Sequence, residues 1–254
     1  MREKIIEFYD SCDENVRLNE NSVHYIEFLT SIKFFEKVFP SNSKILDACA
    51  GTGAYAFHLA EQGHHVTAGD IAPRNVEVMK EKQALNPLLD EIYVGDTLDL
   101  TRFSAQSFDV VLCMGALYHL PDKQDRYNVV SECLRVLKKG GIFVGSYMNR
   151  FAVVLQNCNG NLGNIDEVLM FIKEGTEGPF YASSPKEIKT MMNDFSLEEL
   201  HHFGADGIGY LLYGITNLID AEGFENWRQY HFATCEEESL LGYSYHGVYM
   251  GRKR

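Results

Sequence analysis

Hydrophobic positions in the first part of the chain alternate between short continuous runs and longer stretches with helical spacing. The continuous runs are "KILDAC", "HHVTAG", "EIYVGD", "FDVVLCMG" and "GIFVGSYM", a pattern typical of strands that are covered on both faces. The helical stretches include Ser22–Phe39, which Pro40 ends, and segments that begin at Ala54, Pro73 and Asp122. Strands that alternate with helices pair in parallel with right-handed crossovers, so this part predicts a doubly wound α/β sheet.

The rhythm changes after Met148. Residues 149–178 read as an insertion of loops and helices, and "SPKEIKTMMNDF" predicts a helix with Ser184 as its N-cap. "SLEELHHFG" and "GYSYHGVYMG" predict two more strands, while "IGYLLYGITNLI" and "FENWRQYHFATCEEE" between them look helical. The expected fold is therefore a mostly parallel seven-stranded sheet with helical cap insertions.

Composition and charge narrow the class of protein. The 254 residues include 36 acidic and 23 basic side chains, for a net charge of −13, which repels phosphate backbones and argues against a nucleic-acid partner. No apolar run approaches the roughly 20 residues of a membrane span, and the first residues lack a signal-peptide pattern. The six cysteines form no CxxC pair. We expect a cytoplasmic protein that uses no metal.

Two glycines, Gly51 and Gly53, follow the first predicted strand. Glycine lets the backbone turn sharply and touch a ligand, and the amides at the start of the next helix face the same ligand. Asp47 precedes this loop, and Asp70 and Asp96 end the second and third predicted strands. Because the carboxyl ends of parallel strands meet at one edge of the sheet, these side chains are expected to surround one ligand.

Two ligands are compatible with this loop. The spacing Gly51-x-Gly53-x-x-Ala56, followed by Asp70, also matches the loose fingerprint of a nicotinamide dinucleotide site. That loop receives a pyrophosphate, which Asp47 would repel, and Asp96 would have no role there. A positively charged amine, a ribose diol and an adenine amino group account for all three carboxylates, and S-adenosylmethionine carries all three groups.

The motifs also resemble a known family. "ILDACAGTG" resembles the first motif of class I S-adenosylmethionine-dependent methyltransferases, usually written ILDxGCGTG, and "VTAGD", "VGDTLDL", "FDVVLCMGALYHL" and "LKKGGIFVGSY" match later motifs in order. The close resemblance covers residues 41–148, and the whole chain is similar to small-molecule methyltransferases of the ubiquinone/menaquinone C-methylase type. Cys49 stands where the family usually has its first glycine, with Ala50 beside it. Both are small, so we expect the loop to keep its path.

The resemblance implies a Rossmann-like methyltransferase fold in three parts. Residues 1–40 would form N-terminal helices that cover the cofactor site, and residues 41–148 the S-adenosylmethionine-binding core. Residues 149–254 would form cap insertions plus the last helix and the final two strands of the same domain. The implied activity is in-line methyl transfer to a small-molecule acceptor, with S-adenosylhomocysteine as product, by a monomer or homodimer that binds neither nucleic acid nor membrane. Two alternatives stay open: a cofactor-binding protein without transferase activity, and a nicotinamide-dependent oxidoreductase.

The resemblance also implies roles for individual residues. Asp47 would organise the loop and the ligand's amine, and Gly51 and Gly53 would pass under the methionyl and ribose parts. Asp70 would accept both ribose hydroxyls, and Asp96 the adenine amino group. The full set of expected cofactor-binding residues is Asp47, Ala48, Cys49, Gly51, Gly53, Asp70, Ile71, Asp96, Thr97, Leu98, Cys113, Met114 and Gly115.

Candidate catalytic residues follow the fourth predicted strand. "MGALYHLPD" places Tyr118 and His119 at the mouth of the site. His119 can act as a general base if the acceptor must lose a proton, or it can hold the loop by packing and hydrogen bonding, which we favour. Tyr118 can offer its ring face to the sulfonium or belong to the core. Tyr9 and Tyr25 are candidates for closing over the cofactor.

Two further groups have open interpretations. His201 and His202 are adjacent on a predicted strand, so they point to opposite faces and make a poor metal pair. Aromatic residues in the last third of the chain can line an acceptor pocket or form the core of the cap, and the second is favoured. They are Phe180, Tyr181, Tyr210, Tyr213, Trp227 and Tyr230.

Overall fold

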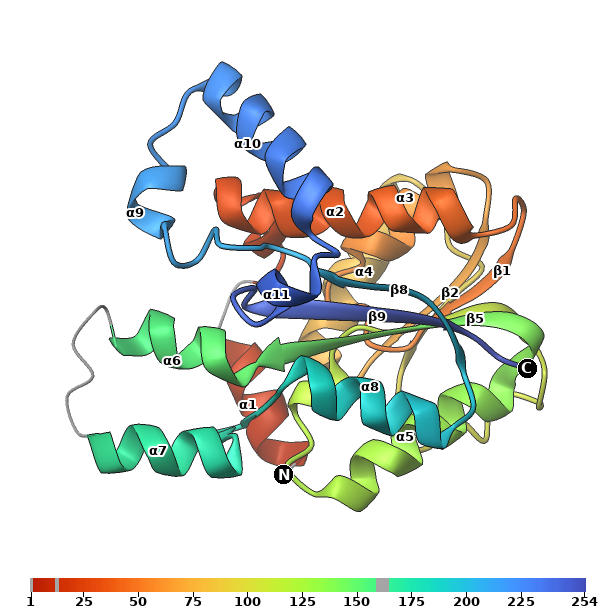
Figure 1. Ribbon diagram of the computed structural model, residues 1–254. Helices are drawn as coiled ribbons and strands as arrows, with labels where there is room; N and C mark the ends of the chain where they lie inside the picture. The colour runs from red at the N-terminus through yellow and green to blue at the C-terminus, as the bar shows by residue number, and fades with distance from the viewer. Residues whose placement is uncertain (1, 12–13, 159–164) are drawn as a thin grey trace.

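A twisted sheet runs through the centre of the computed structural model, which describes residues 2–11, 14–158 and 165–254 (Figure 1). Its strands follow the order β3–β2–β1–β4–β5, and the sheet continues from β5 through β9 to β8. The strands are β1 (Lys44–Asp47), β2 (His65–Asp70), β3 (Glu91–Val94), β4 (Phe108–Cys113), β5 (Leu137–Asn149), β8 (Glu198–Gly204) and β9 (His246–Arg252). The first five pair in parallel, and β9 is antiparallel to both β5 and β8. The predicted mostly parallel α/β sheet is confirmed.

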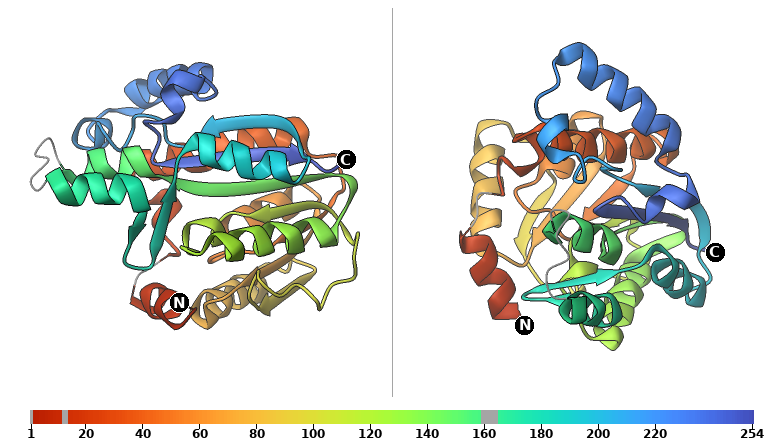
Figure 2. Two further views of the ribbon diagram at one scale, coloured as in Figure 1. Left: turned by 60° about the horizontal axis from the view of Figure 1, so that its bottom comes forward. Right: turned by 60° about the vertical axis from the view of Figure 1, so that its left-hand side comes forward.

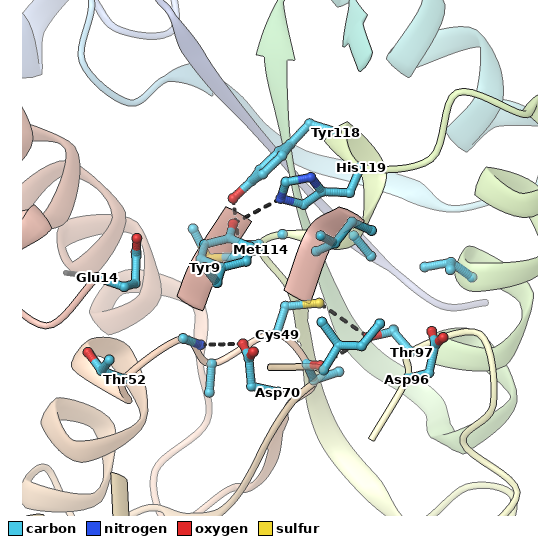
Figure 3. Close-up of a pocket in the computed structure, with 18 of the residues that line it drawn as sticks. Tyr9, Glu14, Cys49, Thr52, Asp70, Asp96, Thr97, Met114, Tyr118 and His119 are labelled. Carbon is cyan, nitrogen blue, oxygen red and sulfur yellow. Dashed lines mark hydrogen bonds between the residues drawn. The ribbon is translucent and has the colours of Figure 1, made fainter. Parts of the chain in front are cut away.

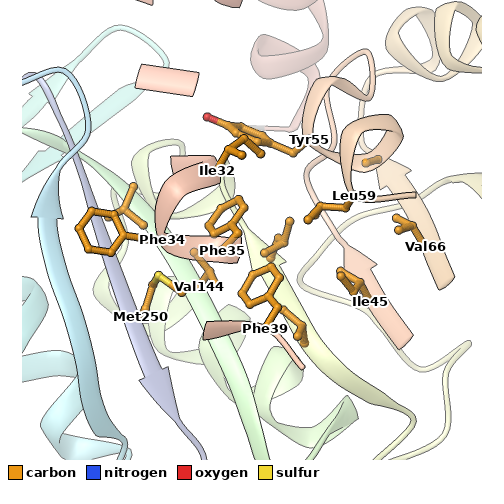
Figure 4. Close-up of a cluster of buried hydrophobic side chains, with 14 of the residues drawn as sticks. Ile32, Phe34, Phe35, Phe39, Ile45, Tyr55, Leu59, Val66, Val144 and Met250 are labelled. Atoms are coloured by element: carbon orange, nitrogen blue, oxygen red, sulfur yellow. The ribbon is translucent and has the colours of Figure 1, made fainter. Parts of the chain in front are cut away.

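Helices cover both faces of this sheet. One face carries α2 (Ser22–Val38), α3 (Ala54–Glu61) and α4 (Pro73–Leu85), whose apolar side chains pack with strand residues such as Ile45 (Figure 4). The other face carries α5 (Lys123–Val136) and α8 (Pro185–Asp194), which pack with the alternate strand residues such as Leu46. Ile45 and Leu46, which are adjacent on β1 and point to opposite faces, are therefore both fully buried. Burial on both faces explains the continuous apolar runs in the sequence.

The insertion after β5 contains helices α6 (Arg150–Cys158) and α7 (Ile165–Glu174), as expected, and both extend beyond the end of the sheet (Figure 2). Residues 159–164 of the predicted insertion lie outside the described residues. A hairpin of β6 (Thr176–Glu177) and β7 (Phe180–Ser183) follows, and β7 pairs in parallel with the end of β5. This hairpin was not predicted because its strands are too short to show a period.

Several predicted boundaries and elements differ in the structure. The helical stretch that begins at Asp122 continues in the sequence up to Gly140, but the helix ends at Val136, because Leu137 already pairs with Phe108 in the sheet. The expected helix "IGYLLYGITNLI" is mostly turns and holds only the four-residue α9 (Tyr213–Thr216). The short elements η1 (Arg17–Asn19), η2 (Ala116–Tyr118) and α11 (Glu238–Leu241) were not predicted. The helix α1 (Arg2–Ser11) lies in the region where N-terminal helices were expected, and α10 (Ala221–Thr234) was expected. Within the described ranges, no helix combines the length and the apolar character needed to cross a membrane.

The end of β2 depends on a glycine. A Cβ built on Gly69 would lie 2.2 Å from Cζ of the buried Tyr93 ring. We expect Gly69→Ala to lower the free energy of unfolding in urea by about 1–3 kcal/mol, because the methyl group overpacks this contact. Gly242→Ala is the matched control, since nothing lies within 4 Å of its Cβ position. Equal effects of the two substitutions would show that Tyr93 does not require a glycine at position 69.

Candidate active site

A pocket opens at the carboxyl ends of β1, β2 and β4, beneath the N-terminal segment (Figure 3). It holds about 1180 Å³ of space between protein atoms, counting the part that is open to solvent, which is enough for a nucleoside with a further substituent. Its lining comes from the strand ends and from residues before α2. The strand-end residues are Ala48–Thr52, Ala54, Tyr55, Asp70, Ile71, Asp96–Leu98, Met114–Ala116 and Tyr118–Leu120, and the N-terminal residues are Arg2, Ile5, Tyr9, Glu14, Asn15, Arg17 and Leu18; Asp125 and Val129 complete the lining.

The loop after β1 requires glycine at two positions. Gly51 has φ +56° and Gly53 has φ +89°, values that side chains with a Cβ rarely adopt. Cys49, at the position where the family usually has glycine, does not have a positive φ. A Cβ on Gly115 would lie 2.8 Å from the Cβ of Cys49, so the bare backbone at Gly115 leaves room for the cysteine. The loop thus accommodates the departure from the family motif.

Asp70 joins this loop to the start of α4. Its Oδ2 accepts a hydrogen bond from the Gly51 N–H at 2.8 Å, and its Oδ1 accepts from the Ala72 N–H at 2.8 Å and from Asn75 at 3.2 Å. Burial raises the pKa of Asp70 to about 6. A carboxylate offers about four acceptor positions. Asp70 can therefore accept these hydrogen bonds within the chain and still present an acceptor to the pocket that it lines.

The segment after β3 forms the neighbouring wall. Oδ1 of Asp96 accepts a hydrogen bond from the Leu98 N–H at 3.0 Å, which closes a tight turn. The Thr97 hydroxyl donates to the carbonyl oxygen of Ala48 at 3.0 Å and lies 3.2 Å from Sγ of Cys49. Thr97 therefore connects the end of β3 to the loop after β1, and Asp96 remains at the pocket surface.

Three of the expected cofactor residues lie behind the wall. Gly53, Cys113 and Asp47 do not line the pocket. Asp47 is only 1% exposed, and its Oδ2 has no hydrogen-bond partner among the described residues. Burial raises the pKa of Asp47 to about 7. The structure thus places Asp47 under the loop and the other ten expected residues at the pocket surface.

His119 connects three separate segments. Its Nδ1 lies 3.1 Å from the carbonyl oxygen of Pro179 in the hairpin, and its Nε2 lies 2.9 Å from the hydroxyl of Tyr9 in α1. A carbonyl oxygen can only accept, so Nδ1 carries the proton and Nε2 accepts from Tyr9. Burial lowers the pKa of His119 to about 4, so the ring is neutral near pH 7. Tyr118, beside it, donates to the carbonyl oxygen of Met114 at 3.4 Å.

Other residues singled out in the sequence lie elsewhere. Tyr25 is 40% exposed and stacks on Phe224, away from the pocket lining. His201 contacts Glu236, whereas His202 contacts Tyr147 on the opposite face of β8. The six aromatic residues considered for an acceptor pocket do not line this pocket, although two of them, Trp227 and Tyr230, line a smaller one with His231. Of the cysteines, Cys12 lies outside the described residues.

Most of the N-terminal lining, above all Glu14 and Arg17, was not predicted from the sequence. Their segment has no strand or helix periodicity and lies far along the chain from the loop that it covers. The acidic residues in Ser11–Glu20, "SCDENVRLNE", form no motif that points to a binding site. Only the folded arrangement brings them to the pocket.

The donor and acceptor chemistry of the pocket fits S-adenosylmethionine. Asp70, Asp96 and Glu14 all present carboxylates to one cavity, which suits a ligand with a ribose diol, an adenine amino group and an ammonium group. A pyrophosphate would meet negative charge at each of these positions. The bare backbone at Gly51 allows such a ligand to lie directly on the loop.

Comparisons with known proteins agree with this chemistry. A family model described as a methyltransferase domain matches residues 46–145. A ubiquinone biosynthesis O-methyltransferase from Vibrio atlanticus is 30% identical over 174 residues, which cover 66% of this chain and 67% of that protein. The chain belongs to the class I S-adenosylmethionine-dependent methyltransferases. It is an enzyme with S-adenosylmethionine as cofactor, and the nicotinamide alternative is set aside.

Further relatives extend the comparison of this methyltransferase. A putative methyltransferase, YqeM, from Bacillus subtilis is 28% identical over 147 residues, which cover 58% of this chain and 59% of that protein. The N-methyltransferase NodS from Bradyrhizobium japonicum, crystallised with S-adenosylhomocysteine, shares the fold with a TM-score of 0.62 at 14% identity and covers 99% of this chain and 98% of that one. The matched region thus spans about two thirds or less of the curated relatives' length, whereas the fold is shared along the whole chain.

The role expected for Asp70 can be measured directly. Charge-assisted hydrogen bonds from a ribose diol to a carboxylate contribute on the order of 1.5–3 kcal/mol, so Asp70→Ala should weaken S-adenosylhomocysteine binding at least tenfold by calorimetry. An ionised carboxylate is a stronger hydrogen-bond acceptor than its protonated form. Because the pKa of Asp70 is raised to about 6, wild-type affinity should fall as the pH drops from about 7.5 to about 5.

Asp70→Asn provides the matched control, because it keeps one acceptor oxygen and cannot titrate. Its affinity should be low and should depend less on pH than that of the wild type. Affinity within twofold of the wild type in Asp70→Ala would leave Asp70 as a residue that only orders the loop and the start of α4.

Proposed function

We propose that this methyltransferase transfers its methyl group to a small-molecule acceptor that is enclosed beneath α1. The observation that carries the proposal is the hydrogen bond between Tyr9 of α1 and His119 on the facing wall. It closes α1 over the strand ends that line the pocket. A macromolecular acceptor would have to displace this cover, whereas a metabolite fits beneath it.

Further contacts support this cover. The ring of Phe8 meets Phe180 of the hairpin edge to face, with centroids 5.0 Å apart. Two residues later in the same helix, the carbonyl oxygen of Asp10 accepts a hydrogen bond from Arg74 of α4. The C-terminal half of α1 therefore contacts both the hairpin and α4, and the side views show α1 near these two elements (Figure 2). These contacts favour residues 1–40 as the cover of the site and residues 41–148 as its core.

Charge and relatives favour the same class of acceptor. The pocket presents Glu14, Asp70, Asp96 and Asp125, and the whole chain carries a net charge of −13, so a polyanion such as RNA is disfavoured. The Vibrio relative is named for O-methylation in ubiquinone biosynthesis. We propose a cytoplasmic enzyme, monomeric or homodimeric, whose described cysteines, such as Cys113, remain reduced.

The residues at the pocket surface are assigned to different parts of the cofactor. Asp70 accepts the ribose hydroxyls and Asp96 the adenine amino group, with Ile71, Thr97 and Leu98 beside the ring. Ala48, Cys49, Gly51, Met114 and Gly115 form the floor, while Asp47, Gly53 and Cys113 support it from behind. S-adenosylmethionine supplies an activated methyl group on a sulfonium, so the chain mainly has to align the acceptor and exclude water.

Tyr118 and His119 occupy the acceptor side. Burial raises the pKa of Tyr118, so it stays a neutral phenol whose ring face can lie against a cation. The Nε2 lone pair of His119 is engaged by Tyr9, and its pKa of about 4 makes the ring a weak base. We infer that His119 holds the cover in place and does not remove a proton from the acceptor.

Substitutions of His119 separate these roles. If His119 is the general base, both His119→Ala and His119→Asn should lower kcat by roughly 10²–10⁴-fold with little change in cofactor affinity. We expect instead that His119→Asn retains substantial activity, because asparagine keeps a hydrogen bond to the cover. Steady-state kinetics and calorimetry on both variants, with Tyr9→Phe as the partner substitution, distinguish the two outcomes. A large loss of kcat in His119→Asn at unchanged affinity would contradict our assignment.

The acceptor class has its own test. Purified enzyme is incubated with S-adenosylmethionine labelled in its methyl group and with a cell extract separated into dialysable and macromolecular fractions. We expect label to appear in a dialysable product, and Asp70→Ala to suppress it in proportion to its lost cofactor affinity. Transfer of label only to protein or RNA would contradict a small-molecule acceptor.

A further inference from the structure

Glu14 and Arg17 form an ion pair inside the pocket that the sequence motifs do not account for. Nε of Arg17 donates to Oε1 of Glu14 at 2.7 Å, and both residues line the pocket. Behind them, the two terminal nitrogens of Arg17 donate to both carboxylate oxygens of Glu27 in α2, at 3.0 and 3.3 Å. The pair thus presents one acid and one base side by side to the ligand.

Glu14 lies directly over the glycine loop. A Cβ built on Gly51 would come within 3.4 Å of Cγ and 3.8 Å of Oε1 of Glu14. In Figure 3, Glu14 and Asp96 lie on opposite sides of Asp70. If Asp96 marks the adenine end of the ligand and Asp70 its ribose, Glu14 marks the third part, which is the methionyl chain.

The methionyl chain ends in a zwitterion, with an ammonium and a carboxylate on the same carbon. A carboxylate beside a guanidinium complements both charges. The hydrogen bonds among the described residues use three of the five N–H groups of Arg17 and a single oxygen of Glu14. The pair therefore keeps donor and acceptor capacity for a ligand.

We propose that Glu14 binds the ammonium group and Arg17 the carboxylate group at the amino-acid end of S-adenosylmethionine. This assignment rests on the proposed function of the pocket. It replaces Asp47 in the amine-binding role implied by the family motif, because Asp47 is buried beneath the loop and does not line the pocket. Asp47 keeps its role of organising the loop.

The surroundings of Arg17 hold its guanidinium in place before a ligand arrives. Glu27 is buried, and although burial opposes its ionisation, Arg17 and His246 hold its pKa at about 2. Nδ1 of His246 lies 3.4 Å from Glu27 and 2.8 Å from Asp206. A side chain that is fixed in its binding orientation loses less conformational entropy on binding.

The three residues behind Arg17, which are Glu27, Asp206 and His246, are of the types that bind metal ions. One ligand atom each from Glu27, Asp206 and His246 lies within 4.8 Å of the others. Asp206, however, already accepts hydrogen bonds from the Ser244 hydroxyl and from the backbone N–H groups of Tyr245 and His246. Glu27 likewise already accepts hydrogen bonds from Arg17 on both carboxylate oxygens. These donors make the group a hydrogen-bonded support for Arg17.

Two ligands test the assignment by calorimetry on the intact protein. S-adenosylhomocysteine carries the amino-acid end, and 5′-methylthioadenosine lacks it while keeping the adenosine and the thioether. Glu14→Gln should weaken S-adenosylhomocysteine binding about tenfold or more and change 5′-methylthioadenosine binding less than about threefold. Arg17→Lys keeps the charge and loses the planar fork, so it should show the same selectivity with a smaller loss.

Glu20→Gln is the matched control, because Glu20 lies on the same segment, is 61% exposed and does not line the pocket. It should leave both affinities unchanged. A deaminated analogue of S-adenosylhomocysteine gives a test without substitution: it should bind the wild type weakly and should not respond to Glu14→Gln.

Two results would overturn the assignment. One is an equal effect of Glu14→Gln on both ligands, or no effect on either. The other is a selective loss of S-adenosylhomocysteine binding in Asp47→Asn but not in Glu14→Gln. A wild-type protein that binds 5′-methylthioadenosine and S-adenosylhomocysteine equally well would refute the amino-acid subsite alone, whereas one that binds neither would refute the proposed pocket as well.

Discussion

The hydrogen bond from the Gly51 amide to the Asp70 carboxylate is the constraint on which the site depends. Gly51 has a left-handed backbone where it makes this bond, and the bond joins the loop after β1 to the end of β2. The same carboxylate orders the first residues of α4. The floor of the pocket, the position of the adjacent helix and the surface beneath Glu14 all follow from this one junction.

The core of the fold could be predicted because local sequence determines it. Strands β1, β2 and β4 are covered on both faces, so each appears in the sequence as an unbroken apolar run. The acids Asp70 and Asp96 could then be recognised by their positions at the ends of predicted strands. The cover could not be predicted in this way. Tyr9 meets His119 across 110 residues of sequence, and the hairpin strands are too short to carry a period. Glu14 and Arg17 become recognisable only when their segment folds over Gly51.

This division matches the family comparison. The family model covers residues 46–145, which hold the loop and the strand ends. The cover, the hairpin and the proposed amino-acid subsite lie outside that range. We infer that the shared core carries the adenosine part of the ligand, and that the segments around it, through residues such as Tyr9 and Glu14, determine how the remaining groups are held.

The contact between Cys49 and Gly115 has an evolutionary consequence. The cysteine side chain occupies the space that a Cβ at position 115 would need, so the effect of a substitution at either position depends on the residue at the other. Glycine at position 49 would leave room for alanine at position 115, whereas any residue with a Cβ at position 49, including this cysteine, crowds it. Such epistasis fixes the order in which the two changes can accumulate, and it links the first motif of the family to the end of a strand more than sixty residues later.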